Sequence, residues 1–380
     1  MLTKPLVSTT QVSDLVFRIF GDALHAKRCV SVANGVIGVM HADSLSIHDI
    51  GRGLARAREV NAKHAIKQVD RLLSNHGLTM EDAFGAWVPW LVGHRSEIVV
   101  TIDWTEYADD GHSRIAINLV TDHGRATPLV WKTVRSDTLK DHRSEYESDA
   151  LDTLRAALPP GVRVTVLGDR GFGDSSLYEY CDEVLHFDYV FRFRGCIKVW
   201  DEDGKVAKAH DRVPEDGSAR RIDNARVTHR RYQVGAVVCV HDQGMKEAWC
   251  LATSRSDSAD EAVALYGKRF TTEETFRDEK DPHFGMGVLD TQIDDPARRD
   301  RLLLLLAIAS ALLTLIGAAG EKVGAYRTIK ANTSTRRQHS LFRQGREYVR
   351  GALEAHRYED LRVEFRHALD ERRAAVMGLI

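Results

Sequence analysis

Apolar residues recur at helical spacing in the first part of the chain. Residues 44–58 have one such pattern, and Asn61 stands where an N-cap would begin a second helix over residues 62–75. The predicted buried side of that second helix consists of Ile66, Val69 and Leu73. We therefore predict a helical region over residues 1–85.

Strand-like patterns begin at residue 97. Three β-rich runs are separated by short, turn-like links, which predicts a meander of antiparallel strands over 97–104, 113–120 and 128–134. A helical stretch over 144–158 and an apolar strand over 162–169 come next. This order of elements predicts a mixed sheet with a crossover helix, which is an α/β fold class.

Residues 186–255 remain strand-like, with no helical pattern between the runs, and this predicts an all-β insertion. Helical patterns resume near residue 258 and continue almost to Ile380. Within them, residues 302–320 carry no charge and approach the length that crosses a bilayer. We interpret this segment as a helix buried inside a large domain; a membrane span is the alternative.

Composition argues against a disulfide framework or a zinc site, and it neither indicates nor excludes nucleic-acid binding. The 380 residues carry 53 Lys and Arg against 55 Asp and Glu, so no global basic field indicates a nucleic-acid partner. The five cysteines are widely spread and form no CxxC pair, which argues against a disulfide framework or a zinc site. The start of the chain has no signal-peptide pattern, so we expect a cytoplasmic protein.

Local charge is more informative than the total. Residues 1–76 carry ten Lys and Arg against six Asp and Glu, and a basic stripe on the second predicted helix consists of Lys63, Lys67 and Arg71. Such a stripe predicts DNA contact, although a solvated helix face has the same spacing. The strongest basic patch lies in residues 321–350, with eight Lys and Arg, including Arg336 and Arg337, against two Glu.

Two apolar strands end in a carboxylate, at Asp103 and at Asp169. Ligands of open α/β sheets bind at strand ends, so both residues are candidate ligands, although a turn or cap role is the alternative for each. A third acid lies in a polar stripe of residues 266–280. On a single helix, one narrow face would carry Tyr266, Arg269, Glu273 and Lys280, flanked by Phe270 and Phe276.

Three carboxylates gathered in a partly dry cleft repel one another, and a divalent metal removes that repulsion. Ligation by oxygen alone favours Mg²⁺ or Mn²⁺, and a pair of such ions stabilises both the attacking and the leaving oxygen of a displacement at phosphorus. Arg269, Lys280 and Tyr266 are then suited to hold phosphates.

The run Tyr266, Arg269, Glu273, Lys280 resembles the YREK signature of bacterial DDE transposases of the insertion-sequence-four family, and residues 266–288 resemble its Tn-ten group. TIDW at Asp103, GDRGF at Asp169, AIKQVDRLLSN and EAWCLATS are similar to stretches of the same group. The resemblance spans roughly residues 25–350 in order. It implies an RNase H-like catalytic core interrupted by an all-β insertion, with helical N-terminal and C-terminal regions.

The resemblance assigns roles to residues. It implies that Asp103, Asp169 and Glu273 bind two metal ions, and that Tyr266, Arg269 and Lys280 hold phosphates at the transposon end. Trp249 would stack on a flipped base, with a sheet-core Trp as the alternative, and Arg192 and Arg194 would touch DNA. The domains expected are 1–85 (DNA-binding), 90–185 and 256–320 (core), 186–255 (insertion) and 321–380 (basic C-terminal region).

The implied reaction is cut-and-paste transposition through nicking, hairpin formation, hairpin opening and strand transfer. Its partners would be double-stranded DNA, as terminal inverted repeats and target, and a second copy of the chain in the DNA-bound complex, with no membrane. A bacterial, nucleoid-associated protein is expected. The alternatives are an RNase H-like endonuclease that cuts without joining and a catalytically inactive DNA-binding regulator.

Overall fold

The structure is a computed structural model that describes residues 6–107, 110–281, 285–330, 333, 337–351 and 355–370. Its first part is helical, as predicted. The helices are α1 (Thr9–Phe20), α2 (Ala26–Met40), α3 (Ile47–Arg58), α4 (Ala62–Leu73) and α5 (Met80–Val92). The predicted N-cap of α4 is confirmed, because the Asn61 side chain accepts the Lys63 amide at 3.0 Å.

One face of α4 is buried, with a small difference from the pattern predicted. Val69 and Leu73 are buried, whereas Ile66 is only half-buried. Ala65 and Leu72 complete the buried face. The helical part also continues beyond residue 85, through α5.

A central eight-stranded sheet follows, and it begins with the predicted antiparallel meander. The three strands are β1 (Glu97–Tyr107), β2 (His112–Leu119) and β3 (Thr127–Arg135). The predicted crossover helix is α6 (Arg143–Ala157), and the strand after it is β4 (Arg163–Gly168), which pairs parallel to β1. The α/β class and the mixed sheet are therefore confirmed.

Part of the strand-rich segment continues the central sheet. Strand β5 (Asp188–Phe193), which lies inside the predicted insertion, pairs parallel to β4. The full order is β3-β2-β1-β4-β5-β12-β11-β8, where the last three are β12 (Trp249–Thr253), β11 (Ala236–Val240) and β8 (Arg220–Asp223). The limits of the predicted insertion stay a prediction, but its first strand is part of the central sheet, because β5 has β4 and β12 as hydrogen-bonded neighbours.

A small second sheet completes this part. It has the order β10-β9-β6-β7, with β6 (Lys198–Trp200), β7 (Val206–Lys208), β9 (Arg226–Val227) and β10 (Tyr232–Gln233). Short helical turns are η2 (Ser136–Leu139), η3 (Arg170–Phe172), η4 (Tyr180–Leu185), η5 (Ala209–Arg212), η6 (Val288–Asp290) and η7 (Ala325–Thr328), and α7 (Ser175–Glu179) precedes η4.

The last part is helical. Its helices are α8 (Ala259–Gly267), α9 (Phe270–Lys280), α10 (Pro296–Lys322), α11 (Leu341–Val349) and α12 (Ala355–Asp370). Among the helices described, α10 has the length and apolarity to cross a membrane, yet 94% of its most apolar window is buried inside the protein. It packs against α2, α11, α12 and β3. This burial favours the core-helix interpretation.

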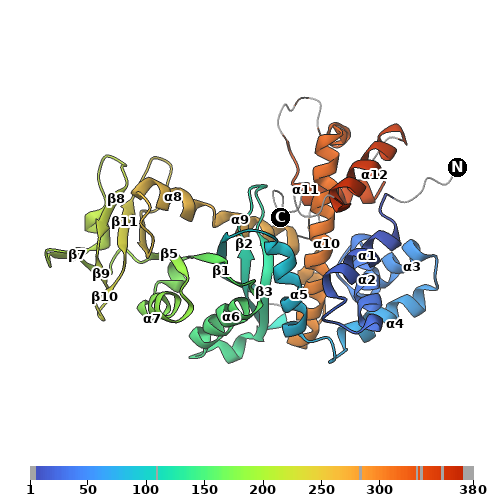
Figure 1. Cartoon of the computed structure of the whole chain (residues 1–380), viewed down its shortest axis with the longest axis horizontal. Helices are drawn as coiled ribbons and strands as arrows, with labels where there is room; N and C mark the ends of the chain where they lie inside the picture. The colour runs from blue at the N-terminus through green and yellow to red at the C-terminus, as the bar shows by residue number, and fades with distance from the viewer. Residues whose placement is uncertain are drawn as a thin grey trace.

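Glycine allows α10 and α11 to approach closely. A Cβ on Gly317 would collide with the Leu341 carbonyl, and a Cβ on Gly345 would collide with the Leu313 carbonyl. The two helices therefore cross with backbone against backbone. Figure 1 shows α10 standing between the central sheet and helices α1–α4, with α11 and α12 beside one end of α10 and the strand-rich lobe at the far end of the molecule.

Candidate active site

Two predicted ligands lie side by side where the parallel pairing of β1 with β4 ends; Asp169 directly follows β4, whereas Asp103 lies within β1, which continues to Tyr107 beside β2 instead of ending at Asp103 as predicted. The register pairs Ile102 of β1 with Gly168 of β4, so the residues that follow, Asp103 and Asp169, are neighbours at the same edge of the sheet. Asp169 also caps η3, since its carboxylate accepts the Gly171 amide at 2.7 Å. The cap role and the candidate ligand role therefore coexist in this residue.

The third predicted ligand, Glu273, lies in the first turn of α9. Two threonines hold this helix against the sheet. The hydroxyls of Thr272 and Thr101 in β1 are 2.6 Å apart and buried, and the Thr275 hydroxyl accepts the Ala126 amide and donates to its carbonyl. Because Thr272 precedes Glu273, this anchoring places the glutamate near Thr101 and Asp103 in the middle of β1.

Arg269 joins two of the three carboxylates. Its guanidinium donates to Asp103 Oδ2 at 3.1 Å and to Glu273 Oε1 at 2.6 Å. The Arg269 side chain is only 9% exposed, and its Nε is buried without a hydrogen-bond partner. We call this arrangement of Arg269, Asp103 and Glu273 the arginine bridge.

The electrostatics of Asp103 place all three acids near one another. Burial raises the pKa of Asp103 to about 6, Arg269 acts in the opposite direction, and the charges of Asp169 and Glu273 add to the rise. A carboxylate feels another charge this way only at short range in a partly dry site. Asp103 therefore lies near enough to both other predicted ligands to feel their charges.

The donor chemistry of the trio fits a hard divalent cation, because every candidate ligand is a carboxylate oxygen. The side chains are not arranged around a metal position, however. In the part of the chain that the structure describes, no three His, Cys, Asp or Glu side chains form a ready metal-binding group. At Asp103 and Glu273, the arginine bridge supplies the neutralising positive charge instead.

Comparison with known families identifies the chain. A family model described as the transposase DDE domain matches residues 102–312, more than half of the 380 residues. The protein belongs to the transposase DDE domain family. The matched range includes Asp103, Asp169 and Glu273, and no curated protein matches the sequence.

Membership confirms the RNase H-like fold class that the sequence predicted, with its mixed sheet and helical termini. It also establishes that this protein is a DDE transposase: an enzyme that acts on DNA and transfers polynucleotide strands with the help of divalent metal ions.

The prediction of one polar helix face over residues 266–280 is only partly correct, because this segment forms two helices instead of one. Helix α8 ends at Gly267 and α9 begins at Phe270. At the junction, the amides of Lys268 and Arg269 donate to the carbonyls three residues earlier, which tightens the helical turn there. Tyr266 therefore lies on a different helix from Glu273.

Within α9 the predicted spacing holds. Lys280 lies two turns after Glu273 and donates to the Glu106 carbonyl at 2.9 Å, with its ammonium 5.5 Å from the Tyr107 ring centre. Burial lowers the pKa of Lys280. Lys280 thus lies beside the last two residues of β1, Glu106 and Tyr107.

Trp249 lies where β12 begins and contacts two rings near the site. Its ring meets Tyr266 edge-on at 4.9 Å and Phe270 at 6.0 Å. Trp249 is half-buried, Tyr266 is fully buried and Phe270 is 44% exposed. Trp249 is therefore neither a sheet-core residue nor a free surface ring, and base stacking stays a prediction.

The predicted arginines of the strand-rich part differ in their surroundings. Arg192 in β5 pairs with Glu247 at 2.6 Å, and Arg170 also contacts this glutamate at 3.2 Å. Arg194 is exposed. An acidic residue thus already engages one of the two predicted DNA contacts.

The basic residues outside the core lie apart from the carboxylates in sequence. Lys63, Lys67 and Arg71 are exposed on α4, as a basic stripe requires. Arg337 donates to the His123 carbonyl at 3.3 Å, and Arg336 lies outside the described residues. Their contact with DNA stays a prediction.

Sequence reasoning missed a buried ion pair beneath α9. Arg114 of β2 and Glu279 of α9 are 2.6 Å apart, and their side chains are 1% and 7% exposed. Glu279 continues the buried face of Thr272, Thr275 and Phe276 at helical spacing. That spacing was the available signal: an acid in line with buried positions needs a partner inside the protein.

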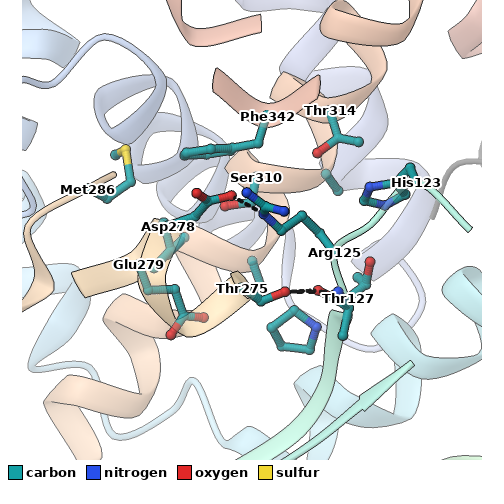
Figure 2. Close-up of a pocket in the computed structure, with 15 residues that line it drawn as sticks. His123, Arg125, Thr127, Thr275, Asp278, Glu279, Met286, Ser310, Thr314 and Phe342 are labelled. Carbon is teal, nitrogen blue, oxygen red and sulfur yellow. Dashed lines mark hydrogen bonds and ion pairs between the residues drawn. The ribbon is translucent and has the colours of Figure 1, made fainter. Parts of the chain in front are cut away.

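A second ion pair borders a cavity on another side of α9. Arg125 donates to Asp278 at 2.6 Å, and its guanidinium lies 3.5 Å from Glu274. Figure 2 shows Arg125 directed at Asp278, with Ser310 and Thr314 of α10 nearby. This cavity of about 50 Å³ includes none of the three predicted metal ligands in its lining.

Proposed function

We propose that this transposase binds two Mg²⁺ or Mn²⁺ ions through Asp103, Asp169 and Glu273. The observation that carries the proposal is that two aspartates on neighbouring strands lie near a helix glutamate, with Asp103 and the glutamate on one guanidinium. Ions bound there would supply the charge that activates an oxygen nucleophile and stabilises the leaving oxygen at phosphorus.

We further propose that the chain belongs to the insertion-sequence-four, or YREK, family and to its Tn-ten-like group. Support comes from the spacing of Tyr266, Arg269, Glu273 and Lys280 and from the motifs around Asp103 and Asp169. In this role Arg269 would grip a phosphate bidentately and Lys280 would act as a point charge. Tyr266 is the least accessible of the three, because its ring is buried against Trp249.

The proposed reaction is cut-and-paste transposition. Water attacks a phosphodiester at the element's end and releases a 3′-hydroxyl. This hydroxyl attacks the opposite strand and closes a hairpin, a second water opens the hairpin, and the 3′-hydroxyl then joins to target DNA. Each step either replaces one phosphodiester bond by another or hydrolyses a phosphodiester bond, so no nucleotide cofactor is needed.

The proposed DNA-binding surfaces extend beyond the site. Exposed Lys63, Lys67 and Arg71 on α4 and exposed Arg194 offer phosphate contacts, and Trp249 offers a stacking surface. Because two ends must be cut together, we propose a homodimer that bridges two terminal inverted repeats. We expect the protein to act in the bacterial cytoplasm, on the nucleoid.

The test compares two neighbouring glutamates of α9. Glu273→Gln should abolish cleavage of a labelled duplex carrying the DNA that flanks the coding sequence, with Mn²⁺ present, and should retain binding of that duplex. Glu274→Gln is the matched control. Glu274 is on the same helix, but it pairs with Arg125, which precedes β3, and with Arg277 of α9. It should cut like the unaltered protein.

The products decide between the proposed function and its alternatives. Hairpins and strand-transfer products support transposition, whereas simple nicks alone favour an endonuclease that does not join strands. Binding of the duplex without any cleavage by the unaltered protein favours an inactive regulator. Undiminished cutting by Glu273→Gln would refute the metal-ligand assignment.

A further inference from the structure

Arg269 occupies an unusual position for a residue expected to bind DNA. Its guanidinium is turned inward, onto two of the proposed metal ligands, at 3.1 Å from Asp103 and 2.6 Å from Glu273. With 9% of its side chain exposed, it offers little surface to a phosphate. A group proposed to bind phosphate is thus directed at the protein's own carboxylates.

The arginine bridge and a bound metal ion compete for the same atoms. The bridge uses one oxygen of Asp103 and one of Glu273, and a hard cation needs the lone pairs of such oxygens. A guanidinium between the two carboxylates also repels an incoming dication, and the repulsion is strong in a partly buried site. Metal binding therefore requires the bridge to open.

The surroundings of Arg269 allow that opening. The residue lies at the tightened junction between α8 and α9, outside the regular part of either helix. Its Nε has no partner, and the Glu273 side chain at the other end of the bridge is 50% exposed. A DNA phosphate near Glu273 would offer a bidentate partner that replaces both carboxylates.

We propose that Arg269 is an internal counter-ion that keeps metal affinity low until DNA withdraws it from Asp103 and Glu273. This inference rests on the proposed metal-ligand role of the trio. By thermodynamic reciprocity, DNA increases metal affinity by the same factor by which metal increases DNA affinity. The full site is then assembled only on substrate.

The test measures Mn²⁺ binding to the whole protein by calorimetry and by the loss of the free-ion electron paramagnetic resonance signal. Without DNA, Arg269→Gln should bind Mn²⁺ at least about tenfold more tightly than the unaltered protein. With the end duplex present, the unaltered protein should bind Mn²⁺ more tightly, and its Mn²⁺ affinity should come closer to that of Arg269→Gln. Arg277→Gln is the matched control, because Arg277 is exposed on α9 and pairs with Glu274; it should behave like the unaltered protein.

A second variant guards against misfolding. Arg269→Lys keeps the charge but loses the two-armed geometry, so its Mn²⁺ affinity should fall between the other two. Equal Mn²⁺ affinities of Arg269→Gln and the unaltered protein without DNA, both abolished by Asp103→Asn, would overturn the counter-ion role alone. Absence of Asp103-dependent Mn²⁺ binding in every protein, with and without DNA, would instead refute the proposed metal site itself.

Discussion

The buried pair of Arg114 and Glu279 leads to a sharp prediction about α9. Both side chains are almost fully removed from water, and their charged atoms lie 2.6 Å apart. Removing one partner leaves the other as an uncompensated buried charge, which typically costs about 3–5 kcal/mol of the free energy of unfolding. We therefore expect Glu279→Leu and Arg114→Met each to lose that amount.

The double variant should behave differently. Replacing both charges by apolar side chains of similar size removes the cost of desolvating the charges together with their attraction, and such replacements are often neutral or stabilising. An aromatic ring already packs against one of the two charges, because the Arg114 guanidinium lies 5.0 Å from the Phe276 ring centre. The coupling between the two sites should then reach about 2 kcal/mol or more.

The assay is urea denaturation of the four proteins in a double-mutant cycle. The exposed pair of Lys132 and Asp149, at 3.1 Å and about half-exposed, is the matched control. Asp149→Asn should change the free energy of unfolding by less than about 1 kcal/mol. Single losses at Arg114 and Glu279 as small as that control would show that the buried pair does not hold α9.

Three further predictions address packing, pH and DNA binding. Gly345→Ala should lower the free energy of unfolding by about 1–3 kcal/mol in denaturant titration, because a Cβ there would collide with α10. Gly85 in α5 has open space around it, so Gly85→Ala should raise the free energy of unfolding by roughly 0.5–1 kcal/mol. Burial raises the pKa of Asp300 to about 7, so between about pH 4 and pH 7 the folded state holds a proton that the unfolded state has lost. The free energy of unfolding should therefore fall as pH rises through this range, by about 1.4 kcal/mol per pH unit at most. Thermal melts of Asp300→Asn should lack this pH dependence, and an unchanged slope would contradict the assignment. Glu247→Gln should release Arg192 and tighten DNA binding severalfold at low salt, as measured by fluorescence anisotropy, and unchanged affinity would remove Arg192 from the DNA surface.

Patterns local in the sequence predicted much of the fold and the identity of the candidate ligands. Asn61 predicts the start of α4, β-rich runs separated by turn-like links predict β1 to β3, and an apolar run ending in a carboxylate marks Asp103 and Asp169. These features are readable because capping and periodic burial depend on neighbours within a few residues. The α/β class followed from the order of such elements.

Only the tertiary structure decided how distant segments meet. The insertion joins the central sheet because β5 pairs with β4, and Glu279 is buried because Arg114, 165 residues away, lies opposite it. The sequence patterns also did not predict that the helix is interrupted between α8 and α9, or that Arg269 pairs with Asp103. The physical reason is common to all: a strand's partner and a charge's counter-ion are chosen by the packing of the whole chain, and no local spacing encodes that choice.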